Sequence, residues 1–182
     1  PHADPIAKVT VVSRGAMGGY TKSLPEEDRH QMSKNQFLDR MAMAMGGRVA
    51  EETQFGEGEI TTGASNDLEQ ATQWARTMVT RYGMSQKLGP RTFGKREELV
   101  FLGREISEQR DYSDRVAETI DEEVHSLVEN AYKRAKGLLT KHKAKLAQIS
   151  NYLLEHETAE GDALTELFNS PVPELPDAMP AD

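Results

Sequence analysis

The sequence predicts a mainly α fold with a small β-hairpin or edge strand near the N-terminus. Apolar residues recur at helical spacing along most of residues 33–168, which is typical of amphipathic helices. One early stretch, residues 8–23, combines β-branched residues with a glycine-containing turn, as paired short strands do. A chain of 182 residues is long enough to bury a core as one domain. We place this domain at residues 1–168 and a disordered, proline-rich tail at residues 169–182.

Composition excludes several classes of protein. The mean hydropathy is −0.66 and no apolar run approaches the roughly 20 residues that span a bilayer, so we expect a soluble chain without direct membrane insertion. The net charge of −8 argues against a nucleic-acid partner, because phosphate binding requires a basic face. There are 0 cysteines, so any metal site must use histidine and carboxylate ligands.

The first elements are a hairpin and a helix. Residues 8–13 form a β-branched run, residues 14–19 a turn, and residues 20–23 a returning strand. Ser33 then begins a helix with Gln36 at the capping-box position, and Phe37, Met41 and Met45 repeat every four residues. Residues 46–47 are both glycine, and two interpretations stay open: a kink, or the close approach of another backbone.

The next predicted helix, residues 66–82, begins with a carboxylate at the edge of its apolar face. Ser65 or Asn66 is the expected N-cap, and Gly83 is the expected stop. On a helical wheel Asp67 lies at the border of the apolar stripe, beside Trp74 about two turns on, so we expect partial burial. Two interpretations follow: Asp67 answers the positive end of the helix dipole, or it binds a donor, a cation or a metal.

The remainder of the chain reads as further helices. A long amphipathic helix opens at Ser113, a second helical pattern covers residues 146–153, and a short helix covers residues 164–168. Four prolines fall among the last fourteen residues, with almost no apolar content, and they predict the disordered tail.

Several motifs resemble one known family. The segment TTGASNDLE at residues 61–69 resembles the third-ligand motif of the FtsH family, which are membrane-anchored, ATP-dependent zinc metalloproteases. Other blocks match in the same order: HADP at 2–5, GGY at 18–20, GGRVAEE at 46–52, GMS at 83–85, VFLGR at 100–104 and IDEEV at 120–124. The resemblance covers essentially residues 1–168.

The resemblance implies roles for named residues. Asp67 would be a zinc ligand, and Glu51 or Glu52 would orient a zinc-bound histidine, although a surface pair at a helix end is an equally open interpretation. The segment Ala16, Met17, Gly18, Gly19 and Tyr20 would be an edge strand that binds polypeptide substrates through its backbone. The helical position of Trp74, two turns after Asp67, leaves two interpretations that do not depend on the resemblance: a residue of a substrate pocket, or a core aromatic near the site.

The resemblance also implies properties of a parent protein. That protein would be an ATP-driven homo-hexamer in the bacterial inner membrane, its peptidase domain would face the cytoplasm, and it would degrade unfolded or membrane proteins. Neither the G-x-x-x-x-G-K-[ST] loop that binds ATP nor the H-E-x-x-H motif of zinc peptidases occurs in this chain. None of its 5 histidines has a second histidine four residues away, and His156-Glu157 is followed by Glu160 instead.

The sequence is compatible with two hypotheses of function. The first is that the chain is a portion of a zinc endopeptidase domain that supplies Asp67 and the edge strand, with no catalytic residue of its own. It would then be inactive alone, because catalytic zinc normally takes three protein ligands. The second is a non-catalytic helical assembly or scaffold module. An H-E-x-x-H motif encoded upstream of Pro1, where the family carries it, would favour the first hypothesis.

Overall fold

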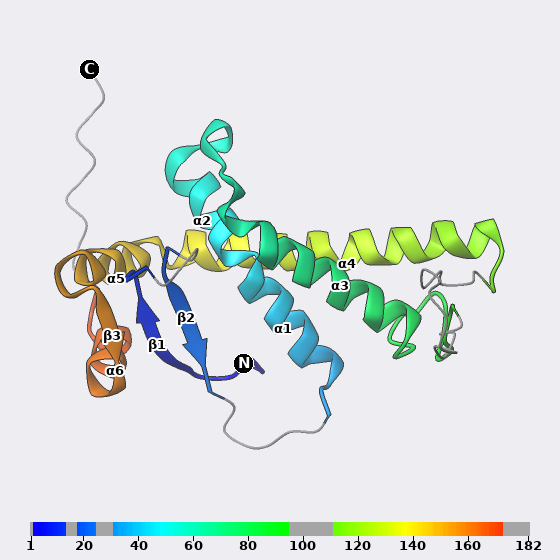
Figure 1. The fold of residues 1–182 in the computed structure, drawn as a ribbon, viewed down its shortest axis with the longest axis horizontal. Helices are drawn as coiled ribbons and strands as arrows, with labels where there is room; N and C mark the ends of the chain where they lie inside the picture. Colours follow the sequence, from blue (N-terminus) through cyan, green and yellow to red (C-terminus); the bar gives the residue numbers. More distant parts are fainter. Residues whose placement is uncertain (1, 14–17, 25–30, 95–110, 173–182) are drawn as a thin grey trace, which may run out of the picture. The chain divides into compact units, whose positions relative to one another are not determined.

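The computed structural model describes residues 2–13, 18–24, 31–94 and 111–172 (Figure 1). It forms two compact units, which we describe separately. The helical unit contains residues 32–136, and the sheet unit combines residues 1–31 with residues 137–182. The sequence predicted one domain over residues 1–168. Within the described part of the chain, no helix combines the length and the apolar character that spanning a bilayer requires.

In its described residues, the helical unit contains four helices and two short 3-10 turns. They are α1 (Lys34–Ala44), α2 (Gly46–Phe55), η1 (Glu57–Glu59), η2 (Thr62–Ala64), α3 (Ser65–Thr80) and α4 (Asp114–Lys141), whose last residues belong to the sheet unit. The predicted capping box opens α1, because Ser33 Oγ accepts from the Gln36 N–H while the Gln36 side chain accepts from the Ser33 N–H. Helices α1 and α3 pack side by side (Figure 1).

The core of the helical unit follows the predicted apolar stripes. Its largest fully buried side chains are Met41, Met45, Val49, Met78 and Val79. Met45 alone separates α1 from α2, and a Cβ placed on Gly46 or Gly47 would meet no atom within 4 Å. No backbone therefore approaches these glycines among the described residues, which favours the kink interpretation.

One carboxylate lies inside this core. Asp39 of α1 is 6% exposed, and its Oδ1 lies 2.6 Å from Nη1 of Arg134 on α4. A buried carboxylate requires such a partner, since desolvation penalises the isolated charge. The ion pair joins two helices whose partner residues are far apart in the sequence, and the periodicity of α1 had not indicated it.

Among the residues that the structure describes, the sheet unit contains a three-stranded antiparallel sheet and two helices. Its elements are β1 (Ile6–Thr10), β2 (Tyr20–Ser23), α5 (Lys143–His156), β3 (Thr158–Glu160) and α6 (Gly161–Asn169). The strand order is β2-β1-β3, with Val9 opposite both Thr21 and Ala159. The mainly α fold with a small β element is confirmed, whereas the third strand had not been predicted.

The end of α6 is held by α5. Lys145 Nζ donates to the carbonyls of Leu167 at 3.1 Å and Ser170 at 2.6 Å, and Gln148 Nε2 donates to the Ser170 hydroxyl at 3.0 Å. These bonds satisfy carbonyl groups that a helix C-terminus leaves without partners. In the predicted tail, Asn169 ends α6, and Ser170 and Pro171 accept hydrogen bonds from α5. Residues 173–182 lie outside the described residues.

Candidate functional site

The segment that leads into α3 is a tight polar turn. Thr61 precedes η2, and its Oγ1 accepts from the Gly63 N–H at 3.1 Å. Helix α3 follows without a break, and its own N-cap position, Ala64, makes no side-chain hydrogen bond. The predicted N-cap at Ser65 or Asn66 is therefore wrong. The 3-10 turn moves the capping interaction one turn upstream, to Thr61.

Asp67 lies in the first turn of α3 and is exposed. The expected partial burial is wrong, because the buried positions of α3 begin one turn later, at Ala71. Within the described residues the Asp67 carboxylate takes part in no hydrogen bond or ion pair. It therefore offers free oxygens at the positive end of a helix, where a negative charge is stabilised.

The donor set around Asp67 limits what this chain can hold. A carboxylate oxygen is an ordinary zinc ligand. In the described part of the chain, however, no group of three or more His, Asp or Glu side chains is placed to hold a metal ion. Asp67 consequently fits the role of a single ligand, and a complete site would need donors from other residues.

Glu51 is bound to the turn that precedes α3. Its Oε1 accepts from the Thr61 hydroxyl at 2.6 Å and its Oε2 accepts from the Thr61 N–H at 3.0 Å. The hydrogen bond from the Thr61 hydroxyl lowers the pKa of Glu51 most, and the bond from the Thr61 N–H lowers it further. Both carboxylate oxygens of Glu51 are thus engaged, and they fix the turn from which Asp67 follows.

Glu52 is bound to the opposite side, by α4. Its Oε1 lies 2.9 Å from Lys136 Nζ, and its Oε2 accepts a short hydrogen bond from the Tyr132 hydroxyl. The hydrogen bond from Lys136 lowers the pKa of Glu52 most, and the bond from Tyr132 lowers it further. In return, the Glu52 carboxylate raises the pKa of Tyr132 and of Lys136. Sequence reasoning missed Tyr132 and Lys136, because no spacing pattern links residues that lie 80 and 84 positions apart.

The predicted edge strand is described in part. Ala16 and Met17 lie outside the described residues, whereas Gly18 and Gly19 lead into β2, which begins at Tyr20. In the order β2-β1-β3, β2 occupies one edge of the described sheet. A Cβ on Gly19 would lie 2.6 Å from the Thr10 carbonyl oxygen, so this position requires glycine for the close approach of β1.

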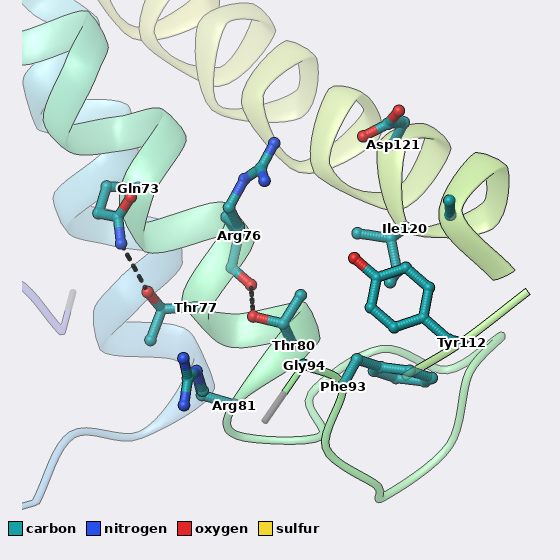
Figure 2. Close-up of a pocket in the computed structure, with 11 residues that line it drawn as sticks. Gln73, Arg76, Thr77, Thr80, Arg81, Phe93, Gly94, Tyr112, Ile120 and Asp121 are labelled. Carbon is teal, nitrogen blue, oxygen red and sulfur yellow. Dashed lines mark hydrogen bonds between the residues drawn. The ribbon is translucent and has the colours of Figure 1, made fainter. Parts of the chain in front are cut away.

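A pocket of about 400 Å³ lies elsewhere in the helical unit (Figure 2). It is bounded by the C-terminal half of α3, the segment after it and the start of α4. Phe93 and Tyr112 contact each other edge to face there, and Arg76 points toward α4. Asp67, Glu51 and Glu52 do not line this pocket, and neither does the half-buried Trp74. The pocket is therefore separate from the carboxylates singled out in the sequence.

His156, which begins the incomplete His-Glu motif, serves the local structure. Its ring stacks on Tyr152 with centroids 4.2 Å apart, and its Nδ1 lies 3.1 Å from the Tyr152 carbonyl oxygen. The next residue, Glu157, ends α5 in a left-handed conformation. This pair is not arranged as the start of a metal-binding helix.

Comparison with known proteins agrees with these motifs. The model of peptidase family M41 matches residues 1–167. The chain is 58% identical over 173 residues to ATP-dependent zinc metalloprotease FtsH 1 of Sphaerobacter thermophilus, covering 95% of this chain and 26% of that protein. It is 55% identical to FtsH 1 of Thermomicrobium roseum, with the same coverage, and 46% identical to FtsH of Thermotoga maritima over 93% of this chain and 28% of that protein. The chain thus spans about a quarter of the length of these relatives. It belongs to peptidase family M41.

Proposed function

We propose that this chain is the portion of a zinc endopeptidase domain that supplies, through Asp67, one carboxylate ligand of the catalytic metal. The observation that supports this role is the free, exposed carboxylate of Asp67 at the start of α3. In this respect Asp67 differs from Asp39, Glu51 and Glu52, whose carboxylates have partners within the chain. Membership of a peptidase family favours this function over a non-catalytic assembly module.

The two remaining ligands and the general base would come from an H-E-x-x-H helix outside this chain, as in the resemblance described above. Zinc held there would activate water and stabilise the oxyanion of the scissile peptide. This chain's part is to hold one negatively charged oxygen ligand at a defined place. Asp67 can do this because Glu51, Thr61 and η2 determine where α3 begins.

The second contribution that we propose is the binding of polypeptide substrates along the edge of β2. An edge strand presents backbone N–H and C=O groups to an extended peptide and binds it with little regard to sequence. That property suits the degradation of unfolded or membrane proteins. The proposal covers Gly18, Gly19 and Tyr20 together with Ala16 and Met17.

Further properties are proposed for the complete protein rather than for this chain. The names of the relatives describe ATP-dependent enzymes, so we propose that an ATPase module drives substrate into the peptidase domain. Anchoring in the bacterial inner membrane, with the peptidase domain in the cytoplasm, and assembly as a homo-hexamer follow from the family resemblance.

The experiment is the Asp67→Asn substitution in the complete protein. Asparagine keeps the size of the side chain but removes the charge. A ligand role predicts a zinc content far below stoichiometric and loss of casein hydrolysis, with ATP hydrolysis retained. The measurements are metal analysis of the purified protein and the two activity assays, with Asn66→Ala as a neighbouring control.

The opposite result would be equally clear. If Asp67 only answers the helix dipole, the substitution costs about 0.3–1 kcal/mol of stability and leaves zinc and proteolysis intact. That outcome would remove Asp67 from the site and make Glu51 or Glu52 the next candidate ligand.

A further inference from the structure

We infer that Lys136 and Tyr132 of α4 are positioning residues for the Asp67 ligand, acting through Glu52 and the end of α2. This inference rests on the proposed function of Asp67. It concerns three residues that make no contact with Asp67 themselves: Glu52, Tyr132 and Lys136. We call these three the anchor.

Burial of apolar side chains does not hold the end of α2. This helix has only 10 residues, and helices of such length are marginal without tertiary support. Its one buried residue is Val49, and its last three residues, 53–55, are all exposed. Phe55 is 67% exposed, so even the terminal aromatic ring adds little apolar burial.

The anchor instead holds the end of α2 through hydrogen bonds and an ion pair between Glu52 and α4. Lys136 Nζ lies 2.9 Å from Glu52 and 3.4 Å from the Tyr132 hydroxyl, and the Tyr132 hydroxyl donates to the other oxygen of Glu52. Lys136 and Tyr132 are one turn apart on α4, so they reach the same carboxylate from one helix face. The Glu52 side chain is 21% exposed, and its hydrogen bond with Tyr132 is partly buried.

Glu51, the residue next to Glu52, links the end of α2 to the start of α3. Glu51 hydrogen-bonds both the backbone and the hydroxyl of Thr61. The same hydroxyl accepts from the Gly63 N–H, two residues before α3 begins. A Cβ on Gly63 would lie 3.2 Å from Thr61 Oγ1 and 3.6 Å from Glu51 Oε1, so the turn packs closely against Glu51. A displacement of the end of α2 would therefore displace the start of α3, where Asp67 lies.

The test is the zinc dissociation constant of the complete protein, measured by competition with a chelator. Lys136→Met keeps the length of the side chain but removes the charge, and Tyr132→Phe removes only the hydroxyl. Loss of groups that orient metal ligands typically weakens zinc binding 10- to 100-fold. Because the anchor does not contact Asp67 directly, we expect zinc binding to weaken about tenfold in Lys136→Met and less in Tyr132→Phe. Lys136→Arg should restore binding close to that of the parent protein.

The matched control is Lys133→Met. Lys133 lies on the same helix and pairs with Glu129 at 2.8 Å, but it does not contact Glu52. This control should leave the zinc dissociation constant unchanged. A visible spectrum of the Co²⁺-substituted protein provides a second readout, since a ligand that moves alters the coordination geometry even when folding is preserved.

The outcomes separate the two proposals. A lower thermal midpoint with an unchanged zinc dissociation constant and Co²⁺ spectrum in both anchor variants would overturn the positioning role and leave the anchor purely structural. If Asp67→Asn also retains zinc, the proposed function itself fails. If Asp67→Asn loses zinc while both anchor variants bind it normally, only the positioning inference fails.

Discussion

At the scale of single residues, the carboxylates near α3 divide into two kinds. Asp67 is exposed and has no partner within the described residues, whereas both oxygens of Glu51 and of Glu52 are engaged. The sequence identified all three as candidates, because their motifs and helical positions are visible in it. It could not assign their partners, since these depend on which helices pack together. The burial of Asp67 was mispredicted for the same reason. A helical wheel shows which residues form an apolar stripe, but not at which residue other elements begin to pack against it.

Gly83 gives a prediction at this scale. It follows α3 with a φ of +59°, and a Cβ there would lie 2.9 Å from the Cα of Pro90. Left-handed strain together with a backbone clash should make Gly83→Ala cost roughly 1–3 kcal/mol of stability. The measurement is denaturant unfolding followed by the fluorescence of Trp74. It is the single tryptophan of the sequence and lies in the helical unit, as Gly83 does.

The control for this prediction is Gly58→Ala. A Cβ on Gly58 would meet nothing within 4 Å, and its φ lies outside the left-handed range. We expect its unfolding midpoint to stay close to that of the parent chain. Equal midpoints for Gly83→Ala and Gly58→Ala would show that the turn after α3 adapts to a side chain without strain.

At the scale of elements, the sequence predicted the helices and strands that carry a local capping motif or residue pattern. The capping box of Ser33 and Gln36 and the repeat of Phe37, Met41 and Met45 identified α1, and β-branched residues identified the first hairpin strand. Strand β3 has only three residues, Thr158–Glu160, which is too short for a period-two pattern to be recognised. It is defined by its pairing with β1, more than 140 residues away, which is a tertiary contact.

The edge of β2 gives the prediction at this scale. The Leu24 N–H donates to the Pro5 carbonyl at 3.1 Å, and N–H groups alternate in direction along a strand. The Thr21 N–H therefore points away from β1, toward any added peptide. Thr21→Pro in the complete enzyme removes this donor, and we expect the KM for an unfolded protein substrate to rise roughly 2- to 10-fold, the effect of one backbone hydrogen bond.

The matched variant for the strand is Thr21→Val, which keeps the N–H and the shape of the side chain. It should retain the KM of the parent enzyme, and both variants should keep their zinc. An unchanged KM in Thr21→Pro, with the hairpin still folded, would exclude this edge as the binding surface for substrate.

At the scale of the whole molecule, the sequence predicted the fold class and the family. The single domain over residues 1–168 stays a prediction. Within the structure, the chain forms two compact units, and their boundary falls inside α4, between residues 136 and 137. A continuous helix carries no composition change at such a boundary, so sequence patterns could not locate it. The family, by contrast, was readable because many short motifs occur in the same order.

The most direct test of the account is the position of zinc in a crystal structure of the complete peptidase, located by anomalous scattering at the zinc edge. A ligand role for Asp67 predicts one of its oxygens at about 2.0–2.2 Å from the metal, with two histidines from outside this chain. It would be contradicted by fully occupied zinc whose protein ligands exclude Asp67, for example with Glu51 released from Thr61 and bound to the metal in its place.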